Sequence, residues 1–407
     1  MMIFMNLAWH NLLRNQTRSM ATLAAITLGI AMLVFTNGFT NGISANMSDT
    51  IIKQIDGHIR IEHRDYKKFF MSDPEKIVLQ DYSSLVAQLR KIPHVQAVMP
   101  RVMFGGLLGI REKNSTFIGS ANELATLQQV LPDYGSHLVS GALLSETDPN
   151  GVVLGAALAE SLHLNINDEL VLLSKTIHGE QSNTLVHVRG TIRFPTDKLL
   201  EESLLLSSLA PAIREDLLDL GNGASQLIVR LDDTATTAET AQAIERLFAE
   251  QHLPLQVTVW YDNPSFSRIV GVFNGIGGVV MIILVLMVGI ITSNALLMAF
   301  FERMREIGTL RAIGMNRFQL SLLLYLETCM LGLTGAISGL ILGLAMIFIT
   351  QFIGIPIGVI GESVYPAIKL SSLLTSSLVP VFFILLAAYL PIQASKKLSV
   401  IEALNYQ

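Results

Sequence analysis

Four long runs of apolar residues divide the chain. They cover about residues 20–43, 269–300, 318–353 and 372–391, and each has the roughly 18–20 apolar residues that a helix needs to cross a bilayer. Residues 44–267, between the first and second runs, mix polar and apolar positions as a globular domain does. The pattern predicts a membrane protein with four transmembrane helices and a large α+β domain inserted between helices 1 and 2.

Within residues 44–267, short strand-like runs alternate with helical patterns. The segment DGHIRIEH at 56–63 alternates polar and apolar residues, which predicts a half-buried strand. Similar runs are VQAVMP, GVVLG, ELVLL, LVHVRGTIRF, SQLIVRL and LQVTVW, and helical patterns lie near 81–92, 155–164 and 235–251. We therefore expect a mixed domain of two lobes, with Gly105 and Gly106 in a turn. We expect no metal site, because the two histidines of DGHIRIEH lie on opposite faces of its strand.

The first twenty residues contain a polar stripe, since Asn6, His10, Arg14 and Arg18 recur every four positions. This predicts an amphipathic helix lying on the membrane surface, with a disordered basic start as the alternative. The length of the apolar run that follows favours an uncleaved span over a secretion signal. The predicted segments are a surface helix at 1–19, spans at 20–43, 268–300, 318–353 and 372–391, the inserted domain at 44–267, and connecting or terminal segments at 301–317, 354–371 and 392–407.

Charge predicts the orientation of these segments. The stretches 1–20, 301–317 and 392–407 together carry eight basic and three acidic residues, whereas 44–267 carries 18 basic and 28 acidic residues. Basic residues concentrate on the cytoplasmic side of membrane proteins. Both ends of the chain and the 301–317 loop are therefore expected in the cytoplasm. The inserted domain and the short 354–371 loop are expected outside.

The third apolar run contains two features that suit helix packing. Gly335, Gly339 and Gly343 follow one another at four-residue spacing, which lets a neighbouring helix approach closely. Glu327 is the acidic residue of this run, and an intramembrane carboxylate marks a functional candidate. No further acids or histidines line up with Glu327, so anchoring hydrogen bonds to another helix are favoured over a proton path.

The sequence contains no G-x-x-x-x-G-K-[ST] phosphate loop. The spans also lack the paired charges of an ion-coupled carrier. We therefore expect this chain not to be an enzyme, with no catalytic residue and no cofactor of its own. Energy would then arrive from another molecule, and the short charged loop at 301–317 is the expected receiving surface.

At this loop the sequence resembles a known family. Glu302-Arg303-x-Arg305-Glu306-Ile307-Gly308-x-Leu310-Arg311-Ala312-x-Gly314 is similar to the coupling-helix signature of FtsX-like permeases, the membrane subunits of MacB-type and Lol-type ABC transporters. The flanks agree, with Asn294 before it and Pro391-x-x-Ala394-Ser395 after it. The resemblance is dense over roughly the last 140 residues and looser across the inserted domain.

The resemblance implies a mechanism and a set of partners. A dimer of ABC ATPase subunits binds ATP and magnesium, a second permease copy or paralogue completes the complex, and ATPase closure moves the outer domain like a lever. The location implied is the bacterial inner membrane, and no nucleic acid is implied. The coupling residues would be Glu302, Arg303, Arg305, Glu306, Gly308, Arg311 and Gly314.

The cargo stays open between three alternatives. The length and layout favour the lipoprotein-releasing permeases, which extract lipidated cargo from the inner membrane. MacB-like efflux of peptides, toxins or small molecules is the second, and an FtsX-like regulator of a periplasmic enzyme the third. Residues 174–190 contain no proline-rich hook, so docking of a periplasmic chaperone or adaptor remains open. The cargo entrance is expected at Phe35, Phe39, Ile43, Val270, Phe273 and Ile276.

Overall fold

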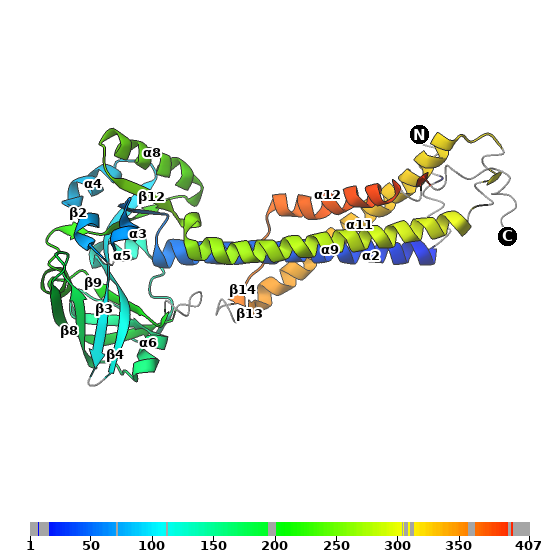
Figure 1. The fold of residues 1–407 in the computed structure, drawn as a ribbon. Helices are drawn as coiled ribbons and strands as arrows, with labels where there is room; N and C mark the ends of the chain where they lie inside the picture. Colours follow the sequence, from blue (N-terminus) through cyan, green and yellow to red (C-terminus); the bar gives the residue numbers. More distant parts are fainter. Residues whose placement is uncertain are drawn as a thin grey trace. The chain divides into compact units, whose positions relative to one another are not determined.

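The computed structural model describes residues 7, 16–70, 72–110, 113–193, 201–302, 304, 308–309, 313–356, 363–389 and 392–393. The chain forms two compact units. One, the membrane unit, holds residues 1–45, 270–355 and 364–407, and the other, the inserted domain, holds residues 46–269 and 356–363. Figure 1 shows the elements of both. The surface helix predicted at 1–19 lies almost entirely outside the described residues.

The membrane unit is built from four long helices, which confirms this part of the predicted fold. They are α2 (Gln16–Thr50), α9 (Pro264–Glu302), α11 (Arg317–Ile353) and α12 (Leu370–Ala387). Each contains a stretch long and apolar enough to cross a bilayer. Helices α2 and α9 extend beyond the apolar runs because the polar residues that flank each run continue the helix.

Polar side chains join α2 to α12 within the membrane unit. Asn37 donates a 2.8 Å hydrogen bond from Nδ2 to Oγ of Ser376. One turn further, Asn41 donates a 3.0 Å bond to Ser372 Oγ. Amide and hydroxyl groups find partners on neighbouring helices in apolar surroundings, because water is absent there. These two bonds therefore fix the register of α2 against α12.

The inserted domain is built around one ten-stranded mixed sheet. Its order is β12-β1-β11-β3-β4-β9-β6-β8-β5, with β7 pairing both β3 and β8. The strands are β1 (Ile59–His63), β3 (Val95–Ile110), β4 (Lys113–Asn122), β5 (Leu138–Gly141), β6 (Gly151–Gly155), β7 (Glu169–Lys175), β8 (Gln181–Ile192), β9 (Leu204–Ser208), β11 (Gln226–Leu231) and β12 (Leu255–Val259). Two short sheets pair β2 (Leu79–Gln80) with β10 (Gly223–Ala224) and β13 (Ile355–Pro356) with β14 (Ser363–Val364).

Part of this sheet closes on itself. The pairings run from β3 to β4, β9, β6, β8 and β7 and back to β3, so these strands form a small barrel. Inward-facing side chains such as Phe104, Leu154 and Leu172 fill it. Strands β12, β1 and β11 continue from β3 outside the barrel and pack a second core against α8 (Thr237–Glu250). The long strand β3 thus belongs to both parts of the domain.

The helices predicted within the domain are confirmed near their expected positions, as α4 (Tyr82–Leu89), α6 (Ala156–Leu162) and α8. Others connect strands: α3 (Tyr66–Phe69), α5 (Leu124–Val130), the π-helices η1 (Ile51–Ile55) and η3 (Ala212–Leu217), and the 3-10 turns η2 (Pro74–Ile77), η4 (Thr234–Thr236) and η5 (Trp260–Asp262).

The turn predicted at Gly105 and Gly106 is wrong. Both residues lie inside β3, opposite Ile118 and Phe117 of β4, and Gly106 also pairs with Ser174 of β7. A Cβ on Gly106 would lie 2.1 Å from the carbonyl oxygen of Leu173. Glycine is therefore required here because the barrel closes by a close backbone approach, and not because the chain turns.

Candidate functional site: a buried polar junction

The structure describes three of the predicted coupling residues, Glu302, Gly308 and Gly314. Glu302 is exposed at the last turn of α9, Gly308 is buried in a helical segment, and Gly314 has a φ of +113°, a backbone conformation that favours glycine. Arg303, Arg305, Glu306 and Arg311 lie outside the described residues.

The predicted packing residues of α11 face α2. A Cβ on Gly335 would lie 2.4 Å from Ile26 Cγ2, one on Gly339 2.8 Å from Ile30 Cβ, and one on Gly343 2.7 Å from Val34 Cβ. All three glycines thus meet side chains along one face of α2, and an added methyl group would push the helices apart. Glu327 is buried on α11, with 6% of its surface exposed.

The predicted cargo-entrance residues lie on α2 and α9. Phe35 and Phe39 are half-buried and stack with ring centroids 6.4 Å apart, whereas Ile43 is buried within the chain. On α9, Val270 and Phe273 are half-buried and Ile276 is 54% exposed. The two helices approach at this level, since a Cβ on Gly277 would lie 3.6 Å from Thr40 Oγ1.

A polar site that sequence reasoning missed lies where the chain enters and leaves the inserted domain. After α2, the chain passes through η1, reaches Asp56, turns at Gly57 with a φ of +62° and begins β1. At its other end the domain passes from β12 through η5 to Asn263, directly before α9. Asn263 Nδ2 donates to Asp56 Oδ2 at 2.8 Å, so the two connecting segments touch.

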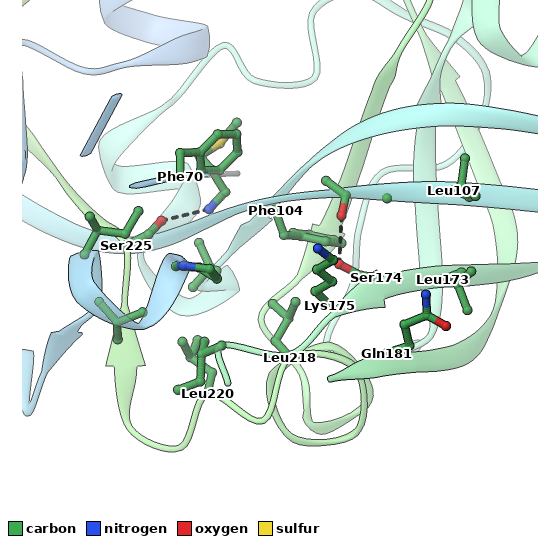
Figure 2. A pocket seen from close by; sticks show the side chains of 18 residues that line it. Phe70, Phe104, Leu107, Leu173, Ser174, Lys175, Gln181, Leu218, Leu220 and Ser225 are labelled. Atoms are coloured by element: carbon green, nitrogen blue, oxygen red, sulfur yellow. Dashed lines mark hydrogen bonds between the residues drawn. The ribbon is translucent and has the colours of Figure 1, made fainter. Parts of the chain in front are cut away.

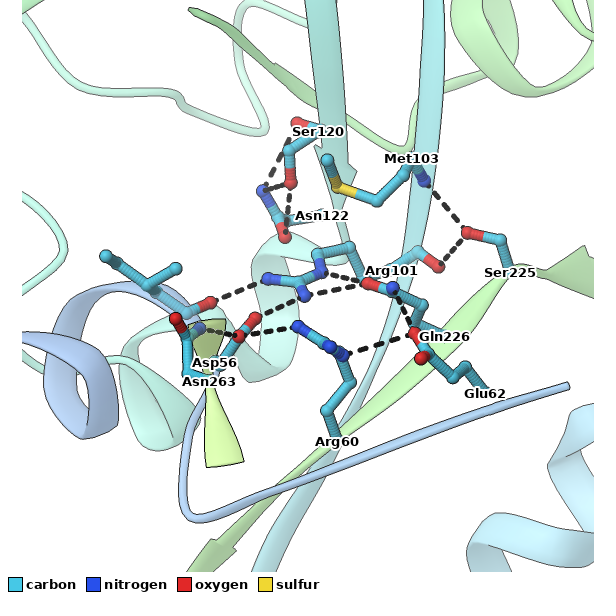
Figure 3. A network of polar contacts seen from close by, with 11 residues as sticks. Asp56, Arg60, Glu62, Arg101, Met103, Ser120, Asn122, Ser225, Gln226 and Asn263 are labelled. Carbon is cyan, nitrogen blue, oxygen red and sulfur yellow. Dashed lines mark hydrogen bonds and ion pairs between the residues drawn. The ribbon is translucent and has the colours of Figure 1, made fainter. Parts of the chain in front are cut away.

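Arg101 of β3 holds the incoming segment to the sheet (Figure 3). Its guanidinium group donates from Nη1 to the carbonyl oxygen of Ile55 and from Nη2 to Asp56 Oδ1, both at 2.6 Å. Its Nε also donates to Gln226 Oε1 at 2.9 Å. Arg60 completes the shell around Asp56, since Nη1 donates to Oδ2 at 2.7 Å. Asp56 therefore accepts bonds from three different segments of the domain.

Glu62 extends the network across the sheet. Its carboxylate accepts bonds from Gln226 Nε2 at 2.8 Å and Gln256 Nε2 at 2.9 Å, and Arg60 Nε lies 3.2 Å away. Two carboxylates and two guanidinium groups thus balance within one buried cluster. We call the set Asp56, Arg60, Glu62, Arg101, Gln226 and Asn263 the junction network.

Burial and pairing act in opposite directions on Asp56. Burial by itself raises the pKa of this carboxyl group, but the charges of Arg60 and Arg101 and the hydrogen bonds from Arg101 and Asn263 outweigh it, and the net pKa lies below the ordinary value. Asp56 is therefore ionised at neutral pH. A buried charge held in this way is strongly destabilising when one partner is removed.

The junction network consists of hydrogen bonds and ion pairs between segments of the inserted domain. Among the residues that the structure describes, no group of three or more histidine, cysteine, aspartate or glutamate side chains is placed to hold a metal ion. A cavity of about 360 Å³ borders the network and is also lined by Tyr134. Among the described residues, the buried hydroxyl of Tyr134 has no hydrogen-bond partner. The junction is thus tightly bonded toward the sheet and less tightly packed on this side.

Comparisons with known proteins agree with this architecture. The family model of the MacB-like periplasmic core domain matches residues 19–247, and that of the FtsX-like permease C-terminal region matches residues 278–400. The chain is 24% identical to the macrolide export ATP-binding/permease protein MacB 2 of Aeromonas hydrophila, over 98% of this chain and 60% of that protein. It is 22% identical to an uncharacterised ABC transporter permease, MJ1507, of Methanocaldococcus jannaschii, over 98% of this chain and 96% of that one.

A solved structure is also similar. The periplasmic region of MacB from Actinobacillus actinomycetemcomitans matches with a TM-score of 0.35 and 15% identity, over 53% of this chain and 94% of that one. The chain spans about three-fifths of the length of the MacB 2 relative.

Proposed function

The chain belongs to the family that combines a MacB-like periplasmic core domain with an FtsX-like permease C-terminal region, and on this premise we propose that it transmits ATP hydrolysis by an ABC ATPase into movement of the inserted domain. As an ABC transporter permease it is a multi-pass protein of the inner membrane. The ATPase is proposed to be a separate dimer, and a second permease chain is proposed to complete the complex.

The junction network is the observation that carries this proposal. Transmission of force requires a rigid connection between the membrane helices and the domain that they move. Both membrane helices that flank the inserted domain lead into residues that bond to each other, Asp56 and Asn263, and Arg101 ties the first of them to the central strand β3. A displacement of either helix end would therefore act on the sheet directly, without passing through a flexible linker.

The loop at 301–317 is proposed to receive the force. Glu302, Arg303, Arg305, Glu306 and Arg311 would contact the ATPase or brace the short helix, and Gly308 and Gly314 would permit its turns. The positive φ of Gly314 supports a turn at that end.

The double substitution Arg305→Glu and Arg311→Glu tests this assignment. The variant is expected to reach the membrane but to lose the stimulation of ATPase activity and transport, because two contacts change sign. The double change Lys396→Glu and Lys397→Glu is the control, since it reverses the same number of charges in the C-terminal tail. Full ATPase stimulation and transport in the Arg305/Arg311 variant would refute the coupling role.

For the cargo we propose lipoproteins or other lipidated molecules taken from the inner membrane. The half-buried aromatic residues Phe39 and Phe273, on the two helices that approach at Thr40 and Gly277, support an apolar entrance there. Efflux of small molecules or peptides is the second candidate, and the macrolide-export names of the relatives favour it. Mass spectrometry of molecules that co-purify with the complex separates the two: acylated polypeptides support the first, and small molecules without acyl chains support the second.

A further inference from the structure

One edge of strand β3 is left open in the middle of the inserted domain. On that side, β11 pairs with β3 as far as Arg101, opposite Gln226, and β7 takes over only at Gly106, opposite Ser174. In the part of the chain that the structure describes, no strand pairs with residues 102–105 on this side. At about 3.4 Å per residue, the five steps from Arg101 to Gly106 leave a window of roughly 17 Å.

Two serine hydroxyl groups mark the ends of this window (Figure 2). The N–H of Met103 donates to Ser225 Oγ at 2.9 Å, and Ser174 Oγ donates to the carbonyl oxygen of Gly105 at 2.8 Å. The N–H and C=O of one residue point to the same side of an antiparallel strand. The C=O of Met103 and the N–H of Gly105 therefore face the window as well, and among the described residues no strand supplies partners for them.

The window opens onto an apolar cavity of about 370 Å³. Its walls include Phe70, Val78, Phe104, Leu173, Leu218 and Leu220. Its charged lining residue, Lys175, is exposed, and the two serine hydroxyl groups are already bonded to β3. This volume falls in the range of ligand sites, roughly 300–1,000 Å³. The site therefore combines an apolar pocket with one backbone acceptor and one backbone donor.

We propose that this window binds an extended, apolar segment of a polypeptide cargo, about three residues long, as an added strand beside β3. The Met103 C=O would accept from an N–H of the segment, the Gly105 N–H would donate to one of its C=O groups, and apolar side chains would fill the cavity. The idea that the segment belongs to cargo rests on the proposed transport function.

The chemistry of the window favours a peptide over a hydrocarbon chain. An acyl chain would fill the cavity but would bury the Met103 C=O and Gly105 N–H without partners, which is unfavourable. The small size of the window favours passing cargo over a permanent partner protein. Three residues bury far less surface than the total of roughly 1,600 Å² typical of a stable protein complex.

A direct binding measurement tests the proposal without using transport. The full-length protein in lipid nanodiscs would be titrated into a fluorescein-labelled Gly-Gly-Val-Leu-Val-amide peptide, with anisotropy as the readout and empty nanodiscs as the blank. Binding is expected, with at least tenfold weaker binding of a peptide whose Val-Leu-Val amides are N-methylated. Hydrogen exchange at the Gly105 amide is expected to slow when the unmethylated peptide is added.

A variant pair checks the location. Val78→Trp is expected to fill the cavity and weaken binding at least tenfold, whereas Leu185→Trp, at a position of β8 that is 53% exposed, is expected to leave binding unchanged.

Equal binding of the methylated and unmethylated peptides to the wild-type protein, or no binding, would overturn the proposal. Because this comparison uses the wild-type protein, its outcome does not depend on whether a variant folds. If the peptide does not bind but lipoprotein transport is observed, the proposed peptide site is refuted and the proposed transport function stands. If the peptide binds but no lipoprotein is transported, the lipoprotein cargo is refuted and the peptide site stands.

Discussion

The side-chain amide of Asn263 lies 2.8 Å from the Asp56 carboxylate, and this bond joins the two segments through which the chain enters and leaves the inserted domain. The bond matters because Asp56 is also held by Arg101, from β3, the strand that belongs both to the barrel and to the part of the sheet outside it. The last residue before α9 is thereby connected to the central strand through a single buried carboxylate.

Asn263→Asp should break the hydrogen bond between Asn263 Nδ2 and Asp56 Oδ2. The substitution removes the amide donor and places a second carboxylate beside Asp56, which is 6% exposed. Loss of a hydrogen bond to a buried charged group costs about 1–3 kcal/mol, and repulsion adds to that cost. We expect a lower thermal unfolding temperature of the full-length protein. We also expect that ATPase activity persists while cargo transport falls.

Asn222→Asp provides the matched control, since it makes the same chemical change at an exposed turn. Its unfolding temperature and transport should equal those of the wild-type protein. If Asn263→Asp behaved in the same way as this control, the junction network would have no role in holding the two segments together.

His58 should make the inserted domain sensitive to mild acid. Burial and the nearby Arg230 lower the pKa of its imidazole to about 4. Nδ1 accepts a bond from the N–H of Leu231, so the neutral ring carries its proton on Nε2, which lies 3.0 Å from Thr234 Oγ1. Protonation of Nδ1 would place its new N–H directly against the N–H of Leu231 and break that bond. Because the folded-state pKa is depressed, the stabilisation is complete above the unfolded-state pKa of about 6.5 and is lost as the pH falls toward 4.

The pKa shift of His58 sets how much of the free energy of unfolding is lost at acid pH. At about 1.4 kcal/mol per unit, the fall of the His58 pKa from its ordinary value to about 4 corresponds to at most about 3.5 kcal/mol. Thermal unfolding between pH 7 and 4 measures it. His58→Asn keeps an acceptor but cannot titrate, so it should flatten the pH dependence, and His252→Asn at an exposed position should not. An unchanged slope in His58→Asn would assign the acid sensitivity to other groups.

Gly339→Ala should separate α11 from α2. The added Cβ would meet Ile30 Cβ and the Thr27 carbonyl oxygen at 2.8 Å, and neither contact is the far end of a flexible side chain. Gly332→Ala is the matched change in the same helix, where the nearest atom lies 3.7 Å away, at ordinary van der Waals distance. We expect Gly339→Ala to lower the unfolding temperature in detergent and Gly332→Ala to leave it unchanged or raise it, since alanine favours helix by about 1 kcal/mol. Equal effects would mean that α2 and α11 do not pack through these glycines.

The parts of the fold that depend on a local sequence pattern were predictable. An apolar run of about twenty residues has few alternatives to a membrane helix, and the helices near 81–92, 155–164 and 235–251 follow from periodicity alone. The barrel was not predictable, because its closure depends on which strands pair. The parallel pairing of β4 with β9, for example, brings Ile118 beside Leu204. The glycine pair at 105 and 106 was misinterpreted for the same reason. Position 106 requires glycine because the backbone of Leu173, on β7, lies directly against it, and the sequence does not show that these two strands pair.

The junction network shows a related limit. The alternation in DGHIRIEH correctly predicts a strand, but a polar face that meets water and one that meets other buried polar groups have the same period of two. Glu62 is in fact only 1% exposed. The residues that bury this face are far away in sequence: Arg101 lies 45 positions from Asp56 and Asn263 lies 207 positions from it. Three closely spaced charged residues, at 56, 60 and 62, were the available signal, and they do not identify their partners.

The proposed cargo entrance on α2 and α9 leads to a last prediction. Phe39 and Phe273 are half-buried side chains on two helices that approach each other at Thr40 and Gly277, and both are apolar, as contact with an acyl chain requires. A photocrosslinking amino acid at either position should capture acylated cargo when the ATPase is present without ATP. The same group at Leu185, exposed on the inserted domain, should capture less of it, because an acyl chain leaving the bilayer loses about 0.8 kcal/mol for each CH₂ exposed to water. Addition of ATP should reduce the signal at Phe39 and Phe273 as cargo is released. Capture at Leu185 alone would mean that cargo reaches this protein from the aqueous side, which would favour efflux of soluble molecules over extraction from the membrane.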